Sequence, residues 1–169
     1  VMQYVIIGGV AGGATVAARL RRLDENASIL LFEKGAYISY ANCGLPYYIG
    51  GTIPERNSLF LQNPTTFGNR FNVDVRVRSE VTSIDKEKKC ITYTQLDTHK
   101  ILTVPYDKLV LSPGTTPVFP PIKGINLPNI FTLKDVNDTD AIKSHLSKHT
   151  GNSRKTAVVV GAGFIGLEM

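Results

Sequence analysis

A glycine-rich turn between two apolar stretches near the start of the chain constrains the fold more than any other feature. An apolar strand over Val5–Ile7 leads into the turn Gly8–Gly13, and a helix over Ala11–Leu23 follows. Ser28–Phe32 is a second buried strand, which ends at Glu33. Strand, turn, helix and strand in this order form a βαβ unit, which requires a parallel sheet and a right-handed crossover. The sequence therefore predicts an α/β fold with a Rossmann-like parallel sheet.

Short β-rich segments further along the chain indicate an antiparallel β insertion. Its expected strands are Val73–Arg78, Val81–Ile84, Cys90–Gln95 and Ile101–Val104. Tyr106–Leu111 then returns as a buried strand, and the proline-rich stretch Thr116–Pro128 is a connector. Helices are expected from Leu45 or Pro46, over Pro64–Phe71, and over Asp135–His149 with Ala141, Ile142 and Leu146 as apolar positions.

The first glycine turn has the residue types of a phosphate-binding loop. Glycine lets the backbone approach a pyrophosphate, and the helix N-terminus offers free N–H groups and a partial positive charge. Gly8 and Gly13 occupy the first and last places of the GxGxxG pattern, and Val10 stands at the middle one. Glu33 follows at the spacing where a carboxylate binds ribose hydroxyls. The alternative is a tight turn that binds nothing.

A second strand, turn and helix begins near the end of the chain. The apolar stretch Thr156–Val160 is expected to be a strand, and the six residues Gly161 to Gly166 match the GxGxxG pattern fully. Two such turns suggest two dinucleotides, typically a flavin and a nicotinamide. The chain ends at Met169, so we expect a fragment of a longer protein, with one nucleotide-binding unit in residues 1–150 and the start of another in 151–169.

Cys43 is the candidate redox residue. It stands just before the expected short helix, where the partial positive charge of the helix end stabilises a thiolate. Tyr48 stands five residues later and Cys90 falls in a predicted strand, so no neighbouring cysteine can form a dithiol. A lone thiolate can form a mixed disulfide with a small thiol, or a sulfenic acid. The alternative is a buried, inert cysteine.

A polar stripe on the first helix is a candidate ligand surface. Thr15, Arg19 and Arg22 are spaced to share one face, which is offset from the apolar positions Val16, Leu20 and Leu23. Arg70 is a further candidate cation. Together these side chains could hold a phosphorylated ligand. A solvated basic face is the alternative.

Composition excludes several classes of protein. The net charge of +5 permits an anionic ligand, and the basic residues are not interleaved with aromatic ones, which argues against nucleic-acid binding. Two cysteines are too few for a disulfide scaffold, and no apolar run is long enough to cross a bilayer. Nothing suggests export, so a cytoplasmic location is expected. His99, His145 and His149 have no metal-ligand partners at useful spacing, and we expect them at the surface.

Several segments together resemble a known family. They are the turn GGVAGGATVAARLRRL, the strand end LFEK, the loop SYANCGLPYY around Cys43, the strand YDKLVLSPG and the second turn VVVGAGFIGLE. The chain is similar to the coenzyme A disulfide reductases, which are pyridine nucleotide-disulfide oxidoreductases with a single active cysteine. The resemblance implies an FAD-containing homodimer that takes hydride from NADH or NADPH and reduces a mixed disulfide between Cys43 and coenzyme A.

The resemblance also implies roles for individual residues. FAD would be held by Gly8, Gly9, Val10, Ala11, Gly12, Gly13, Glu33, Lys34, Val81, Ser112, Pro113 and Gly114, in an incomplete FAD-binding domain. NAD(P) would be held by Gly161, Gly163 and Gly166. Coenzyme A would be held by Thr15, Arg19, Arg22, Ser39, Asn42 and Arg70.

Two other functions stay open from the sequence. One is an NADH oxidase that reduces oxygen through a Cys43 sulfenic acid. The other is a flavin-binding redox sensor without turnover. The resemblance also implies that later segments of the enzyme are missing here, so this chain alone is expected to be inactive. The sequence does not choose between NADH and NADPH, or between coenzyme A disulfide and persulfide substrates.

Overall fold

The structure is a computed structural model that describes residues 1–148 and 156–169. The chain forms two compact units, which we call the first and the second unit. The first contains Val1–Tyr40 and Phe60–Gly114, and the second contains Ala41–Leu59 and Thr115–Met169. The expected boundary between residues 150 and 151 lies outside the described residues and stays a prediction. None of the described helices is long and apolar enough to span a membrane.

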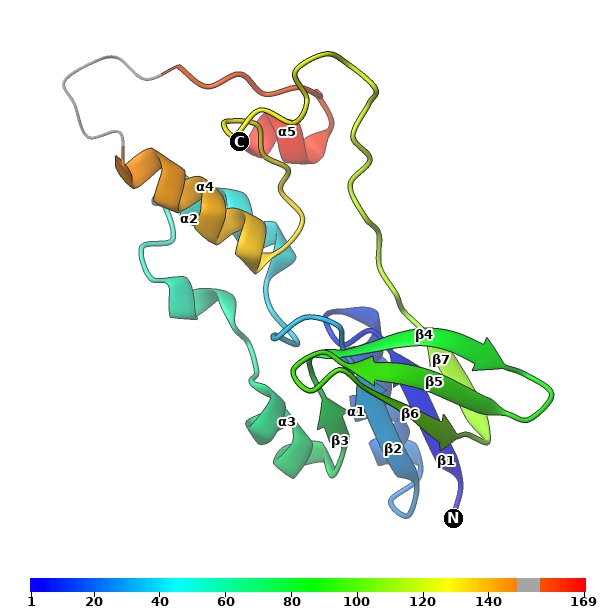
Figure 1. Ribbon diagram of the computed structural model, residues 1–169. Helices are drawn as coiled ribbons and strands as arrows, with labels where there is room; N and C mark the ends of the chain where they lie inside the picture. The colour runs from blue at the N-terminus through cyan, green and yellow to red at the C-terminus, as the bar shows by residue number, and fades with distance from the viewer. Residues whose placement is uncertain (149–155) are drawn as a thin grey trace. The chain divides into compact units, whose positions relative to one another are not determined.

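A four-stranded parallel sheet forms the centre of the first unit (Figure 1). Its strands, in spatial order, are β3 (Asp74–Arg76), β2 (Ser28–Phe32), β1 (Gln3–Ile7) and β7 (Lys108–Leu111). All three neighbouring pairs are parallel. The predicted Rossmann-like sheet is therefore confirmed, although β7 is a half-buried edge strand rather than the buried strand expected over 106–111.

The alternation of side chains along β1 and β2 gives this sheet two buried faces. One face, with Ile6, Ile29 and Leu31, packs with small residues of helix α1 (Gly12–Leu23). The opposite face, with Val5 and Leu30, packs under the antiparallel sheet. Strands buried on both faces are the expected result of continuous apolar runs such as Ser28–Phe32.

The face of α1 that is buried differs in part from the expected one. Leu23 is 66% exposed, and Val16 and Leu20 are only half-buried. The buried positions are instead Gly13, Ala14, Ala17 and Ala18. Small side chains let the helix axis approach the sheet closely. Val16 and Leu20 still pack against this core, so Leu23 is the one predicted apolar position of α1 that is exposed.

The antiparallel sheet has three strands: β4 (Ser79–Asp85), β5 (Cys90–Gln95) and β6 (Lys100–Pro105). The expected fourth strand, Val73–Arg78, is wrong as part of this sheet. Its central residues form β3, which pairs in parallel with β2, and buried Val73 packs in the α1 side of the core. Arg78 has a left-handed backbone, with φ of 52°, and this bend separates β3 from β4.

The second unit contains the segment around Cys43 and the C-terminal helices. The 3-10 turn η1 (Asn42–Gly44) leads into α2 (Leu45–Ile49), as predicted, and the 3-10 turn η2 (Arg56–Leu59) follows. Helix α4 (Val136–Lys148) packs against α2, and α5 (Phe164–Glu168) is the last element. In the first unit, α3 (Pro64–Phe71) has the predicted bounds.

Two expectations for the second unit are corrected. In α4 the buried residues are Val136 and Thr139, whereas Ala141 is exposed, Ile142 half-buried and Leu146 38% exposed; His149 lies outside the described residues. Residues 156–160 form no strand, with Val158 83% and Val160 92% exposed. In the described part of the chain no strand lies beside them to accept and donate backbone hydrogen bonds.

Replacing Gly13 by alanine is expected to lower the free energy of unfolding by about 3 kcal/mol or more. A Cβ at Gly13 would collide with the backbone carbonyl oxygen of Gly8, which cannot move without displacing the turn. Gly12→Ala is the matched control, because its Cβ would lie 2.9 Å from the rotatable Ser112 Oγ. This variant should change stability by no more than about 1 kcal/mol. Equal losses in urea unfolding would contradict the steric explanation.

Candidate functional site

The first glycine turn is a close contact between the ends of three elements. Gly8 has φ of 97°, a conformation that suits glycine, and its N–H donates to the carbonyl of Phe32 at 2.8 Å. A Cβ at Gly8 would collide with the carbonyl oxygen of Ser112, which follows β7. The turn therefore joins the carboxyl ends of β1, β2 and β7, the edge of an α/β sheet where ligands bind.

The N-terminus of α1 is open to an anion. No side chain caps the helix at Ala11, and its first turn carries no acidic residue. Ala11 and Gly12 are exposed. Uncapped amide groups and the positive end of the helix dipole together favour phosphate at this position. The residues Gly8 to Gly13 thus present exposed, uncapped backbone amides at the start of a helix.

Glu33 lies beside this turn, where the sequence placed it. Its Oε2 accepts a hydrogen bond from the Gly9 N–H at 2.8 Å, and its Oε1 accepts one from the Gly35 N–H at 2.7 Å. The half-buried carboxylate fixes the turn and leaves further lone pairs for hydroxyl donors. This chemistry suits the ribose of a dinucleotide.

The other residues expected near FAD are in the first unit. Ser112 is half-buried and its Oγ faces Gly12, while Pro113 and Gly114 continue the chain beyond β7 and are exposed. Lys34 is exposed and pairs with Glu80 at 2.7 Å. Val81 is half-buried at a bulge in β4. With a glycine cradle, an uncapped helix and a carboxylate, the turn fits FAD.

The predicted cationic side chains are all exposed on the first unit, and we call them, together with Thr15, the cationic surface. Thr15, Arg19 and Arg22 are all exposed on α1, and the Arg22 Nε donates to the Ala18 carbonyl at 3.2 Å. Arg70 is exposed near the end of α3, with its guanidinium 5.2 Å from the centre of the Phe71 ring.

Ser39 and Asn42 belong to different units. Ser39 has φ of 47° and its N–H donates to the Gly9 carbonyl at 3.2 Å, so it lies at the glycine turn. Asn42 is exposed in η1, next to Cys43. Ser39 therefore lies beside the first glycine turn in the first unit, and Asn42 lies beside Cys43 in the second.

Cys43 is an exposed free thiol in the 3-10 turn η1. The chain closes on itself around it, since the Gly44 N–H donates to Ala41 at 2.9 Å and the Ala41 N–H donates to Leu59 at 2.8 Å. An exposed thiol is accessible to an external sulfur, which the buried alternative would not be. Cys90 is half-buried in β5, which belongs to the other unit.

Helix α4 fastens the segment that carries Cys43, which the sequence did not predict. Lys143 Nζ donates to the Tyr48 carbonyl at 2.9 Å and lies 4.0 Å from the centre of the Tyr48 ring. Arg56 Nη2 pairs with Asp140 Oδ2 at 2.7 Å. These contacts join residues 95 and 84 positions apart in the chain, so no local sequence pattern signals them.

The second glycine turn repeats the geometry of the first. Gly161 has φ of 119°, and a Cβ at Gly166 would collide with its carbonyl oxygen. Gly163 stands at the N-terminus of α5 without a side-chain cap. The same relation links Gly8 and Gly13.

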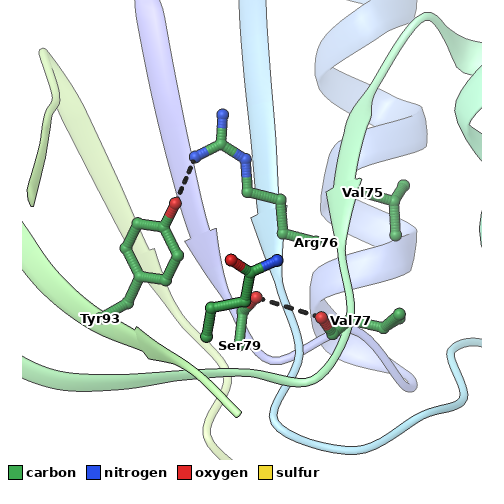
Figure 2. Close-up of a pocket in the computed structure, with 6 residues that line it drawn as sticks. Val75, Arg76, Val77, Ser79 and Tyr93 are labelled. Carbon is green, nitrogen blue, oxygen red and sulfur yellow. Dashed lines mark hydrogen bonds between the residues drawn. The ribbon is translucent and has the colours of Figure 1, made fainter. Parts of the chain in front are cut away.

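A cavity of about 330 Å³ beside β3 contains none of the predicted site residues (Figure 2). Arg76 lies in it, donates to Tyr93 Oη at 3.0 Å and pairs with Asp74. Burial alone would lower the pKa of Arg76, but the hydrogen bond and charge of Asp74, with Tyr93, raise this pKa above its usual value. Arg76 is therefore a fixed cation of the framework.

Two of the three histidines, His99 and His145, lie in the described part of the chain. His99 is exposed in the turn between β5 and β6, whereas His145 is half-buried with its ring 5.0 Å from that of Phe131. Among the described residues, no group of three or more histidine, cysteine or acidic side chains is placed to hold a metal ion.

The sheet, the glycine turn and the carboxylate define a Rossmann-like dinucleotide-binding domain. The chain belongs to the pyridine nucleotide-disulphide oxidoreductase family, whose model matches residues 2–169. It is 39% identical over 167 residues to the coenzyme A disulfide reductase of Staphylococcus haemolyticus (strain JCSC1435), covering 99% of this chain and 37% of that protein. The resemblance predicted from the sequence is confirmed.

Two solved structures are similar over 99% of this chain and 30% of their own. The reduced CoADR-RHD of Bacillus anthracis has a TM-score of 0.93 and 50% identity. The NAD-dependent persulfide reductase from A. fulgidus has a TM-score of 0.91 and 37% identity. The chain thus spans about a third of the length of these relatives.

Glu33→Gln is expected to lower the free energy of unfolding by about 1–3 kcal/mol. The amide retains one acceptor oxygen, so either the Gly9 or the Gly35 N–H loses its partner. Glu80→Gln is the control, because the Glu80 carboxylate pairs with exposed Lys34 and with no other group among the described residues. This substitution should cost less than about 1 kcal/mol. Urea unfolding measures both. A Glu33 variant as stable as the Glu80 variant would show that the carboxylate does not hold the turn.

Proposed function

We propose that the protein containing this chain passes electrons from NADH or NADPH through FAD to Cys43 and reduces coenzyme A disulfide or a related persulfide. The observation that carries the proposal is the exposed thiol of Cys43 in a chain that also has a glycine turn between a parallel strand and a helix. A coenzyme A disulfide reductase and a persulfide reductase among the relatives support the substrate class.

The first unit would bind FAD. Its pyrophosphate would lie against Gly8–Gly13 and the start of α1, with Glu33 accepting hydrogen bonds from the ribose. Ser112, Pro113 and Gly114, with Lys34 and Val81, would complete the pocket. NAD(P) would bind at Gly161, Gly163 and Gly166. Residues 1–150 would form the FAD-binding segment and residues 151–169 the start of the NAD(P)-binding domain.

Cys43 would act as the nucleophile. Its thiolate attacks one sulfur of coenzyme A disulfide, forming a Cys43–coenzyme A disulfide and releasing a coenzyme A thiolate, which takes up a proton. Breaking this mixed disulfide takes two electrons, which a flavin reduced by NADH or NADPH would supply. Cleavage restores the Cys43 thiolate and releases the second coenzyme A.

The cationic surface would recognise the phosphates of coenzyme A. Arg19, Arg22 and Arg70 are exposed on the first unit, and Thr15 shares their helix face. Ser39 and Asn42 would add hydrogen bonds. Guanidinium groups bind phosphate with two parallel hydrogen bonds, which makes arginine well suited to this ligand.

The activity belongs to the longer protein. The chain covers 37% of the coenzyme A disulfide reductase that it matches. We propose that the longer protein is a homodimer and that residues 1–169 alone do not turn over.

Cys43→Ser in the full-length protein is expected to lower turnover of coenzyme A disulfide by at least about a thousandfold, because serine cannot form the mixed disulfide. NADH or NADPH should still reduce the flavin, seen as bleaching of its absorbance. Cys90→Ser is the control and should retain activity, since Cys90 lies half-buried in β5. Turnover that survives in the Cys43 variant would refute the proposal.

The mass of the purified full-length protein should exceed that of its polypeptide by one coenzyme A. Intact mass spectrometry measures this adduct, and a reducing agent should remove it because it is a disulfide. The Cys43→Ser variant should carry none. Rapid oxygen consumption without added disulfide would favour the NADH oxidase. A bound flavin that neither nucleotide reduces would favour the redox sensor.

A further inference from the structure

Arg21 uses every hydrogen-bond donor of its guanidinium on the protein backbone. It lies on α1 between Arg19 and Arg22 but is half-buried, whereas both of those are exposed. A guanidinium has five N–H groups. The five acceptors are the carbonyls of Asp24, Glu25, Ala27, Phe71 and Asn72, at 3.1, 2.7, 2.7, 2.9 and 2.7 Å.

These carbonyls come from three segments of the first unit. Asp24 and Glu25 follow the end of α1, Ala27 precedes β2, and Phe71 and Asn72 end α3. A cation beside the exposed carbonyls of two helix ends is favourable. Among the described residues, no carboxylate pairs with Arg21. The Arg21 guanidinium therefore links three backbone segments and forms no ion pair with a described residue.

Phe71 connects this link to the cationic surface. Arg21 Nε donates to the Phe71 carbonyl at 2.9 Å, and the Arg70 guanidinium lies 5.2 Å from the centre of the Phe71 ring. Arg21 thus holds the backbone of the residue on which Arg70 rests. Arg21 also precedes Arg22 in α1. Its guanidinium therefore connects α1, which carries Arg22, to the end of α3, which carries Arg70.

We propose that Arg21 is a positioning residue that sets the separation of Arg22 and Arg70 for a ligand with several phosphates. The inference rests on the proposed function, in which these two arginines bind coenzyme A. Lysine cannot replace Arg21, because an ammonium group has three donors at one point and cannot reach carbonyls around a planar fork.

The test uses the full-length protein and two substrates with the same sulfur end. Coenzyme A disulfide carries phosphates, whereas the disulfide of pantetheine carries none. Arg21→Lys should raise the KM for coenzyme A disulfide roughly tenfold with kcat nearly unchanged, which corresponds to a loss of binding alone. Its KM for pantetheine disulfide should stay at the wild-type value. Arg78→Lys is the control, since the Arg78 side chain pairs with exposed Asp97 and with no other side chain among the described residues.

A double-mutant cycle separates positioning from general destabilisation. If Arg21 acts through Arg70, Arg21→Lys should add no further rise in KM to an Arg70→Gln protein. Phe71→Leu is a second variant, which keeps the carbonyl that Arg21 holds and removes the ring under Arg70, and it should also raise KM for coenzyme A disulfide selectively. Additive effects, or equal losses with both substrates, would overturn the proposal.

The same assays distinguish this inference from the proposed function. Wild-type protein that neither binds nor reduces coenzyme A disulfide would refute the proposed function, and the inference would fall with it. Wild-type protein that reduces coenzyme A disulfide, with Arg21→Lys and Phe71→Leu unchanged in KM, would overturn the role of Arg21 alone.

Discussion

The absence of side chains at two positions of the first glycine turn is the constraint on which the first unit depends. The Gly8 carbonyl occupies the space that a Cβ of Gly13 would fill, and the Ser112 carbonyl occupies the space of a Cβ at Gly8. Helix α1 can therefore begin directly at the end of β1, and β7 can end beside it. A turn that is this short leaves the first amides of α1 exposed at the sheet edge, where an anion can reach them.

The second glycine turn shows that this geometry is local. Residues 156–160 are not a strand, yet Gly161 and Gly166 make the same backbone contact as Gly8 and Gly13. The contact between the first and last glycines of each turn needs only their spacing, because both residues lie within one stretch of six. A strand needs a neighbouring strand for its backbone hydrogen bonds. The apolar composition of residues 156–160 does not show whether such a neighbour is present.

This difference explains what the sequence predicts well and what it does not. The βαβ unit, the spacing of the glycine turns, the position of Glu33 and the place of Cys43 before a helix follow from local sequence, and β2 and β5 have their predicted bounds. The prediction assigned Val73–Arg78 to the wrong sheet, because strand propensity does not identify which strand will be the neighbour. The Ala-rich face of α1 was missed because close packing against a sheet selects small residues, whereas hydropathy selects large ones.

The contacts of Arg21 and Lys143, which fix the segments carrying the candidate site residues, could not be predicted from the sequence, for a chemical reason. Arg21 and Lys143 both donate to backbone carbonyls, and every residue has a carbonyl. No partner side chain in the sequence indicates such a contact. From sequence alone, Arg21 and Lys143 therefore cannot be distinguished from neighbouring basic residues that are exposed to solvent. Arg19 and Arg22 stay exposed while Arg21 turns inward, although all three share one helix. Helix spacing already grouped Arg19 and Arg22 on one face, but only the structure shows that Arg21 between them is bound to backbone carbonyls.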